Sequence, residues 1–132
     1  MQIVLDTNVF ISGFLFGGKP FEILNHIEDG RIGLCYSAPI RQEVEAVLSE
    51  KFGWPREWIE LACGPLWSLG RRVKPSRTVH ACCDPDDDRI LECAVQARVQ
   101  FIITGDKHLL TMKRFEHIPI LRPDEFLKLA KL

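Results

Sequence analysis

Two acidic residues follow short apolar runs that could be buried strands. Asp6 comes directly after the run at residues 3–5, and Asp106 comes shortly after the run at residues 101–103. Such runs are typical of a parallel sheet covered on both faces, and the active sites of these sheets lie beyond the carboxyl ends of the strands. Helix capping is the alternative explanation for either residue, because Asp is a good N-cap. Two such endings in one small sheet favour a functional site.

The acidic run at residues 84–88 opens a predicted helix and supplies a third candidate. Asp84, with a proline after it, suits the start of a helix, so we assign Asp84 to capping. With an advance of about 100° per residue, Asp87 projects into the middle of the apolar arc of this helix. Asp86 and Asp88 fall on the two flanks of that arc, where we predict exposure to solvent. Capping therefore does not explain why Asp87 lies on the apolar side of this helix.

Glu43 supplies the fourth candidate, at the edge of the apolar arc of a helix predicted over residues 39–51. A carboxylate that faces a core is costly unless it is paired or bound to a metal. Carboxylates gathered in one place repel one another, and a divalent cation removes that penalty. Ligand sets made only of oxygen favour Mg²⁺ or Mn²⁺ over zinc or copper. Such a cation can activate water and stabilise charge on a phosphate.

The elements that must position these residues alternate between strands and helices, within one domain over residues 1–132. This alternation predicts an α/β fold with a mainly parallel sheet. We expect strands at residues 3–5, 32–37, around 73, 101–104 and 118–121. We expect helices at residues 20–29, 39–51, 57–69, 84–98, 107–113 and 123–131, the third weakened by Gly64-Pro65. Residues 9–19 are apolar and contain three glycines, which predicts a turn or loop over the site.

The charge balance gives no general sign of nucleic-acid binding, because 17 Lys and Arg nearly match 18 Asp and Glu. Binding would have to come from local basic groups. One such group lies at residues 71–77 and another lies near Asp106, although either could be only a solvated face. In a nuclease these groups would hold the phosphate backbone. The candidate RNA-binding residues are Arg71, Arg72, Lys74 and Lys107.

Targeting and redox features point to a cytoplasmic protein that is not in a membrane. The chain starts without a basic leader, and its longest nearly apolar stretch, residues 9–16, is too short to span a bilayer. The five cysteines form no CxxC pair, so we interpret them as reduced residues used as small hydrophobes. The neighbours Cys82 and Cys83 receive no role.

The acidic pattern resembles the PIN-domain family of ribonucleases over nearly the whole chain. The resemblance rests on residues 4–8 (VLDTN), 41–44 (RQEV), 84–88 (DPDDD) and 104–106 (TGD), in that order. It implies a three-layer, Rossmann-like fold with about five strands flanked by helices. It also implies an endoribonuclease whose Mg²⁺ or Mn²⁺ ligands are Asp6, Glu43, Asp87 and Asp106. Asn8 and Thr104 match the supporting polar positions of the family.

Order and spacing look particularly like the bacterial and archaeal branch of this family, whose members are described as toxin components of toxin–antitoxin pairs. This resemblance implies a homodimer that a small antitoxin protein silences. Six aromatic residues could supply apolar surface for such contacts: Phe10, Phe14, Phe16, Trp54, Trp58 and Trp67. The alternative is a non-catalytic RNA-binding or regulatory partner domain.

Overall fold

Strands and helices alternate in the computed structural model, which describes residues 1–82 and 84–132. The described residues form six strands and seven helices. The strands are β1 (Gln2–Leu5), β2 (Gly33–Tyr36), β3 (Arg71–Arg72), β4 (Phe101–Ile103), β5 (Arg114–Phe115) and β6 (Ile118–Leu121). The helices are α1 (Thr7–Phe16), α2 (Gly18–Glu28), α3 (Ala38–Glu50), α4 (Arg56–Leu69), α5 (Pro85–Ala97), α6 (Lys107–Met112) and α7 (Pro123–Ala130).

The strands pair in the order β3-β2-β1-β4-β6-β5, and every pair is parallel except β5 with β6. This sheet confirms the predicted α/β class. It has one strand more than expected, because the two-residue β5 is too short to leave an apolar pattern. The pairing of Ile3 with Phe101 and of Leu5 with Ile103 brings the carboxyl ends of β1 and β4 together.

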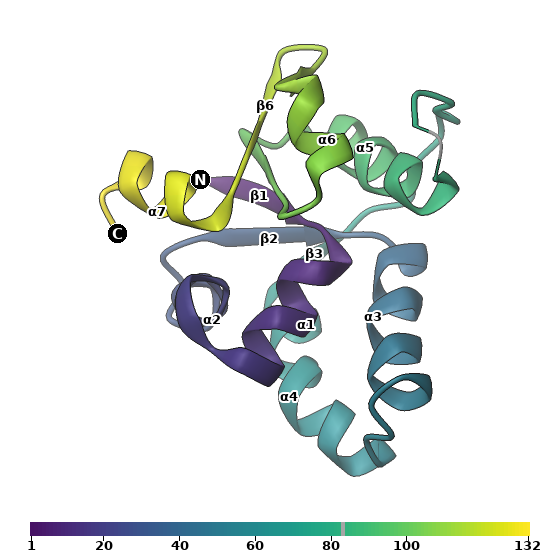
Figure 1. The fold of residues 1–132 in the computed structure, drawn as a ribbon, viewed down its shortest axis with the longest axis vertical. Helices are drawn as coiled ribbons and strands as arrows, with labels where there is room; N and C mark the ends of the chain where they lie inside the picture. Colours follow the sequence, from purple (N-terminus) through teal and green to yellow (C-terminus); the bar gives the residue numbers. More distant parts are fainter. Residues whose placement is uncertain (83) are drawn as a thin grey trace.

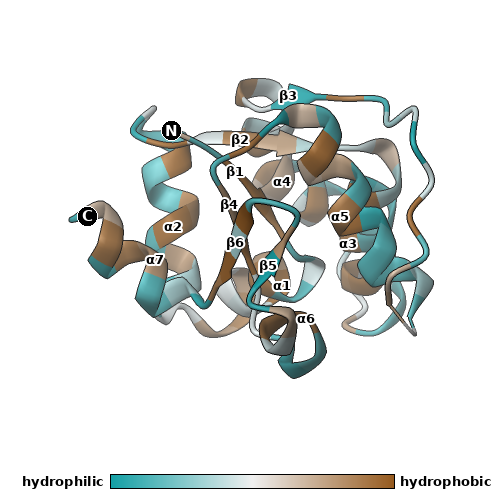
Figure 2. Ribbon diagram, turned by 90° about the horizontal axis from the view of Figure 1, so that it is seen from above, coloured by the Kyte–Doolittle hydropathy of each residue, from teal (hydrophilic) through white to brown (hydrophobic). Residues whose placement is uncertain are grey.

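Helices cover both faces of the sheet. Figure 1 shows α5 and α6 on one side, and α1, α2 and α4 on the other. The central strands between them are apolar, as Figure 2 shows for β4 and β6, and Ile3, Val4 and Leu5 of β1 are almost fully buried. None of the helices in the described residues is long and apolar enough to cross a membrane.

The predicted loop over residues 9–19 is wrong, because most of that segment is the helix α1. Gly13 lies inside α1 where α2 packs closely. A Cβ at this position would stand 2.7 Å from Cδ1 of Leu24 and 3.2 Å from the backbone N of Phe21. Gly17 and Gly18, with φ of 74° and 69°, form the sharp junction between the two helices. Glycine therefore serves close packing at one position and chain reversal at the others.

Two smaller expectations also change. The helix α4 runs unbroken through Gly64 and Pro65 to Leu69. The strand expected around Val73 lies at Arg71–Arg72 instead, and the Val73 N–H donates to the Tyr36 carbonyl at 2.8 Å just beyond it.

The aromatic residues and cysteines divide between core and surface. Phe10 and Trp67 are buried, so they are not available to a partner, whereas Phe16 and Trp58 are exposed. The free cysteines of the described residues are Cys35, Cys63, Cys82 and Cys93. Cys83 lies outside the described residues.

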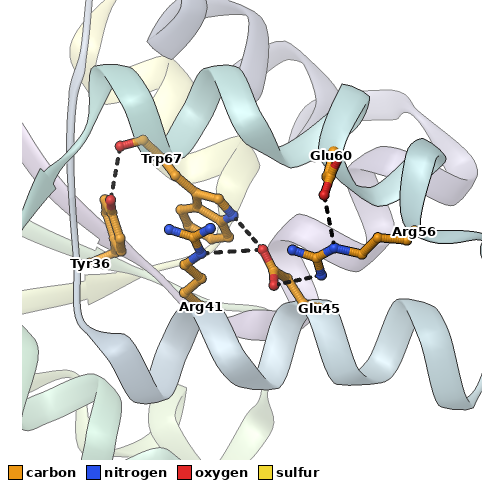
Figure 3. A network of polar contacts seen from close by, with 6 residues as sticks. All are labelled: Tyr36, Arg41, Glu45, Arg56, Glu60 and Trp67. Carbon is orange, nitrogen blue, oxygen red and sulfur yellow. Dashed lines mark hydrogen bonds and ion pairs between the residues drawn. The ribbon is translucent and has the colours of Figure 1, made fainter.

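A polar network fastens α4 to α3, the helix that carries Glu43 (Figure 3). The Glu45 carboxylate accepts hydrogen bonds from Trp67 Nε1 at 3.1 Å, Arg56 Nη1 at 3.1 Å and Arg41 Nε at 3.2 Å. Tyr36 extends the network by donating to the Trp67 carbonyl at 2.9 Å. Burial alone would raise the pKa of Glu45, but the bonds from Arg56 and Trp67 and the arginine charges hold that pKa below its usual range. This network therefore depends on an ionised Glu45.

Candidate metal site

Three aspartates meet at the carboxyl edge of the sheet. Asp6 follows β1, Asp106 lies beyond the end of the neighbouring β4, and Asp87 is in the first turn of α5. One carboxylate oxygen from each residue lies within 4.8 Å of those of the other two. The carboxyl edge thus brings together three of the four acids selected from the sequence.

The Asp6 carboxylate is fixed by the neighbouring strand end rather than by its own helix. Thr104 Oγ1 donates to Asp6 Oδ2 at 2.7 Å, and the Asp106 N–H donates to Thr104 Oγ1 at 3.0 Å. Asp6 stands at the N-cap of α1, yet its side chain makes no capping bond within the described residues. Capping therefore does not account for Asp6, and Thr104 links two of the three acids.

Asp106 does cap the helix that follows it, as the alternative explanation required. Its Oδ1 accepts from the His108 N–H at 3.0 Å at the start of α6. A carboxylate has two oxygens, so capping fixes the orientation of Asp106 and leaves acceptor capacity for a cation.

Burial and repulsion make the cluster costly without a cation. Burial raises the pKa of Asp87 to about 7, with further contributions from the charge and hydrogen bonding of Asp106 and the charge of Asp6. Burial also raises the pKa of Asp6, against the bond from Thr104, and the charge of Asp106 adds to the rise. The metal-free site therefore holds a proton on Asp87 at pH values where an exposed Asp would be ionised.

Glu43 stands at the rim of this site, outside the group whose oxygens lie within 4.8 Å. It is half-buried on α3, and burial raises its pKa, followed by the negative charges of Asp86, Asp6 and Asp84. The Thr7 hydroxyl opposes this rise, because it favours the ionised form of the Glu43 carboxyl. That hydroxyl is buried, and no group of the described residues lies within hydrogen-bonding distance of its oxygen. The rim of the site thus includes a buried hydroxyl group that makes no hydrogen bond.

The expectation for Asp88 is wrong, whereas those for Asp84 and Asp86 are confirmed. Asp84 caps α5 by accepting from the Asp86 N–H at 2.9 Å, and Asp86 is exposed. Asp88 is buried, and its Oδ1 accepts from the N–H groups of Ala81 at 3.0 Å and Cys82 at 2.8 Å. Burial tends to raise the pKa of Asp88, but these two bonds hold it below its usual range. Asp88 pins the segment before α5 and is not part of a solvated flank.

The candidate RNA-binding residues of β3 differ in their surroundings. Arg71 Nη2 donates to the Ala97 carbonyl at 2.6 Å and to Cys35 Sγ at 3.6 Å, so this guanidinium holds the end of α5 against the sheet. Arg72 and Lys74 are exposed and line a pocket of about 510 Å³ beside the start of α3. Their charges are therefore better placed for an external ligand than that of Arg71.

Lys107 and Asn8 complete the residues selected from the sequence. Lys107 is exposed at the start of α6, next to Asp106. Asn8 is exposed and lines a hollow of about 190 Å³ with Gly105.

A larger pocket beside Asp87 was missed by the sequence reasoning. Its volume is about 610 Å³. The described residues that line it are Ala81, Cys82, Asp84, Asp87, His108 and Met112. No pattern in the sequence signals this pocket, because its walls come from a loop before α5 and from the distant α6.

Comparison with known proteins agrees with this arrangement. The family model described as PIN domain matches residues 2–108. The chain belongs to the PIN domain family. This is a family of nucleases, and the present member carries an aspartate cluster at the carboxyl edge of its sheet. An uncharacterised protein of Methanocaldococcus jannaschii is 26% identical, in an alignment that covers 97% of this chain and 90% of the relative.

Solved structures share the PIN fold of this chain. VapBC2 from Rickettsia felis, solved with a DNA fragment from its promoter, gives a TM-score of 0.63 at 11% identity and covers 92% of this chain and 98% of its own. The PIN domain endonuclease Utp24 gives 0.58 at 21% identity, with coverages of 92% and 84%. FitAcB from Neisseria gonorrhoeae gives 0.52 at 19% identity, with coverages of 92% and 97%. At these identities the likeness concerns the fold.

Proposed function

We propose that this PIN domain protein is an endoribonuclease that depends on Mg²⁺ or Mn²⁺ and hydrolyses phosphodiester bonds of RNA. The observation that carries the proposal is the meeting of Asp6, Asp87 and Asp106, whose carboxylate oxygens lie within 4.8 Å of one another. The name of Utp24, a PIN domain endonuclease of the same fold, supports cleavage within a chain.

The residues present fit a hard divalent cation. The donor set is all oxygen, which suits Mg²⁺ or Mn²⁺. The pKa of Asp87 near 7 reflects burial and the negative charge that a cation would offset. Asp6, Asp87 and Asp106 would hold the ion, with Glu43 and the unpartnered Thr7 hydroxyl at its rim. A cation bound there would activate water and stabilise charge on the phosphate in an in-line displacement.

The chain's own residues would orient this chemistry. Thr104 holds the Asp6 carboxylate at 2.7 Å, and the capping bond to His108 N–H holds Asp106. Asp87 would release its proton when the site is loaded, because the opposing positive charge favours the ionised form. Glu43 faces the same edge with a raised pKa, so it is suited to exchange a proton with water at the rim.

RNA as the substrate is supported by the resemblance of the four acidic motifs to the ribonucleases of the family. Arg72, Lys74 and Lys107 would contact phosphates without reading sequence, since they are exposed cations near the carboxyl edge. Such an enzyme would meet its substrate in the cytoplasm.

We also propose a homodimer and a small antitoxin as partners. The bacterial and archaeal branch resembled by the sequence supports both, and the fold shared with VapBC2 and FitAcB is consistent with this branch. Apolar side chains that could cover such contacts remain exposed: Phe16, Trp58, Leu61 and Leu69.

Cleavage of a mixed RNA panel tests the proposal. The purified chain is incubated with Mg²⁺, Mn²⁺ or EDTA, beside Asp87→Asn prepared in the same way as a control for contaminating ribonuclease. We expect cleavage with either metal and none in EDTA, with 5′-phosphate and 3′-hydroxyl product ends. Cyclic phosphate ends formed in EDTA would overturn the metal mechanism. RNA binding without cleavage under every metal condition would favour the non-catalytic alternative.

A further inference from the structure

The pocket of about 610 Å³ beside Asp87 shares a wall with the aspartate cluster. One of its sides is the segment before α5, with Ala81, Cys82 and Asp84, and the other is α6, with His108 and Met112. Because Asp87 belongs to both sites, a ligand larger than a metal ion that is held at the cluster can also contact this pocket. Its volume lies within the range of roughly 300–1,000 Å³ that is usual for small-molecule sites.

Hydrogen bonds fix both walls of this pocket. Asp88 accepts from the N–H groups of Ala81 at 3.0 Å and Cys82 at 2.8 Å, and so holds the first wall. Asp106 accepts from the His108 N–H at 3.0 Å and holds the start of the second. Asp84 is fixed as the cap of α5. Three aspartates therefore fix the walls of the pocket, and one of them, Asp106, also belongs to the cluster.

The chemistry of the walls suits a flat, neutral ring. The thioether of Met112 makes favourable contacts with aromatic rings, and the imidazole of His108 can stack on a base. The carboxylate of Asp84 would repel a phosphate, whereas a neutral base escapes that repulsion. Carboxylates accept hydrogen bonds from the amino groups of bases. The Asp84 carboxylate offers such an acceptor, since its capping bond uses Oδ1.

We propose that this pocket receives the base of the nucleotide next to the cleaved phosphate, with His108 stacked on the ring and Asp84 accepting from an exocyclic amino group. The proposal rests on the ribonuclease function proposed above. Adenine, cytosine and guanine carry such an amino group and uracil does not, so the pocket favours the first three. Asp84 and His108 are thus specificity-determining residues of the site.

Nucleoside 5′-monophosphates test the pocket without any cleavage, because they contain no phosphodiester bond. Titration of the full chain with AMP, CMP, GMP, UMP and ribose 5-phosphate in Mg²⁺ is followed by NMR. We expect AMP, CMP and GMP to bind on the order of tenfold more tightly than ribose 5-phosphate, from stacking of the base. UMP should bind more weakly than the other three nucleotides.

Two variants assign the base contact. His108→Ala keeps the backbone N–H that Asp106 accepts, so the fold should be retained while the base-dependent part of binding is lost. His117→Ala, at an exposed position between β5 and β6, is the matched control and should bind as the wild type does. Asp84→Asn retains capping, since Asn is an equally good N-cap. It replaces a carboxylate with an amide that also donates, and should therefore remove the preference against UMP.

The outcomes separate this proposal from the ribonuclease function. Equal affinities for ribose 5-phosphate and the four nucleotides would overturn the proposed base pocket even if the protein cleaves RNA. An unchanged difference between nucleotides and ribose 5-phosphate in His108→Ala would overturn it as well. If the protein cleaves no RNA but binds nucleotides through their bases, and His108→Ala removes this binding, the base pocket is supported and the ribonuclease function is not.

Discussion

Asp87 concentrates the chemistry of the site in one side chain. It touches both the aspartate cluster and the adjoining pocket, and its pKa is raised to about 7 by burial and by Asp106. Its neighbour Asp86 is exposed, and its neighbour Asp88 is tied to backbone N–H groups. Three consecutive acids therefore have three different roles, which single substitutions can separate.

Asp87→Asn should nearly abolish RNA cleavage while the fold is retained. The amide has the size of the carboxyl group but cannot supply the negative charge that a divalent cation requires. We expect a loss of more than about 100-fold, the upper end of what removing a supporting residue costs. The measurement is the cleavage rate in saturating Mg²⁺ and Mn²⁺. Asp86→Asn is the matched control and should lose far less, and full activity in Asp87→Asn would refute the assignment.

The stability of the metal-free protein should depend on pH through Asp87. Unfolding returns its pKa from about 7 to the ordinary 3.8, so between these values the folded chain binds more protons than the unfolded chain. The stability that this group contributes is fully present below pH 3.8 and is lost as pH rises through 7. Melting temperatures in EDTA should therefore fall more steeply with rising pH in the wild type than in Asp87→Asn. Parallel pH profiles would contradict this linkage.

Helical periodicity predicted that Asp87 points toward the sheet, but it could not predict that Asp88 is buried. Periodicity reports which side of a helix a residue occupies relative to the apolar arc. Asp88 is buried by the loop before the helix, whose Ala81 and Cys82 N–H groups turn back to its carboxylate. Such a contact depends on the path of a loop, and the sequence pattern carries no information on that path.

At the scale of the elements, α1 was missed because it is apolar on several sides. It packs against both α2 and α3, so its sequence lacks the polar face that repeats with the period of a helix. Its glycine suggested a loop, yet Gly13 permits the close approach of α2. The amphipathic α2, α3 and α5 were predicted within a few residues, since each has one buried face.

Alanine at Gly13 should destabilise the fold, whereas alanine at Gly105 should not. A Cβ at Gly13 would meet Leu24 Cδ1 at 2.7 Å and backbone atoms of Pro20 and Phe21 at 3.2 Å. Overpacking of this kind costs about 1–3 kcal/mol. A Cβ at the exposed Gly105 meets no described atom within 4 Å, so Gly105→Ala is the matched control and should change stability by less than about 0.5 kcal/mol. Denaturant unfolding measures both, and equal effects would refute the packing role of Gly13.

The molecule as a whole has a net charge of −1, so its attraction for RNA must be local. The acidic cluster and the exposed Arg72 and Lys74 divide the carboxyl edge into regions of opposite sign. Arg71, although it belongs to the same basic run in the sequence, is bonded to the Ala97 carbonyl. The sequence identified the basic run, but only the bond from Arg71 to the end of α5 distinguishes this arginine from Arg72 and Lys74.

Single-stranded RNA should therefore bind with an affinity that falls steeply with salt and depends on Arg72 and Lys74. Each phosphate contact contributes a slope of about −0.7 to the plot of log affinity against log salt. Replacing both residues by Ala should thus reduce the magnitude of the slope by up to about 1.4 and weaken binding to all sequences alike. Fluorescence anisotropy on Asp87→Asn, which leaves the RNA uncleaved, measures this from about 50 to about 200 mM salt. Lys51→Ala, at the C-cap of α3 and so at the opposite end of this helix from the pocket that Arg72 and Lys74 line, should leave the slope unchanged. Affinity that is insensitive to salt, or equal slopes in all variants, would show that this basic run is only a solvated face.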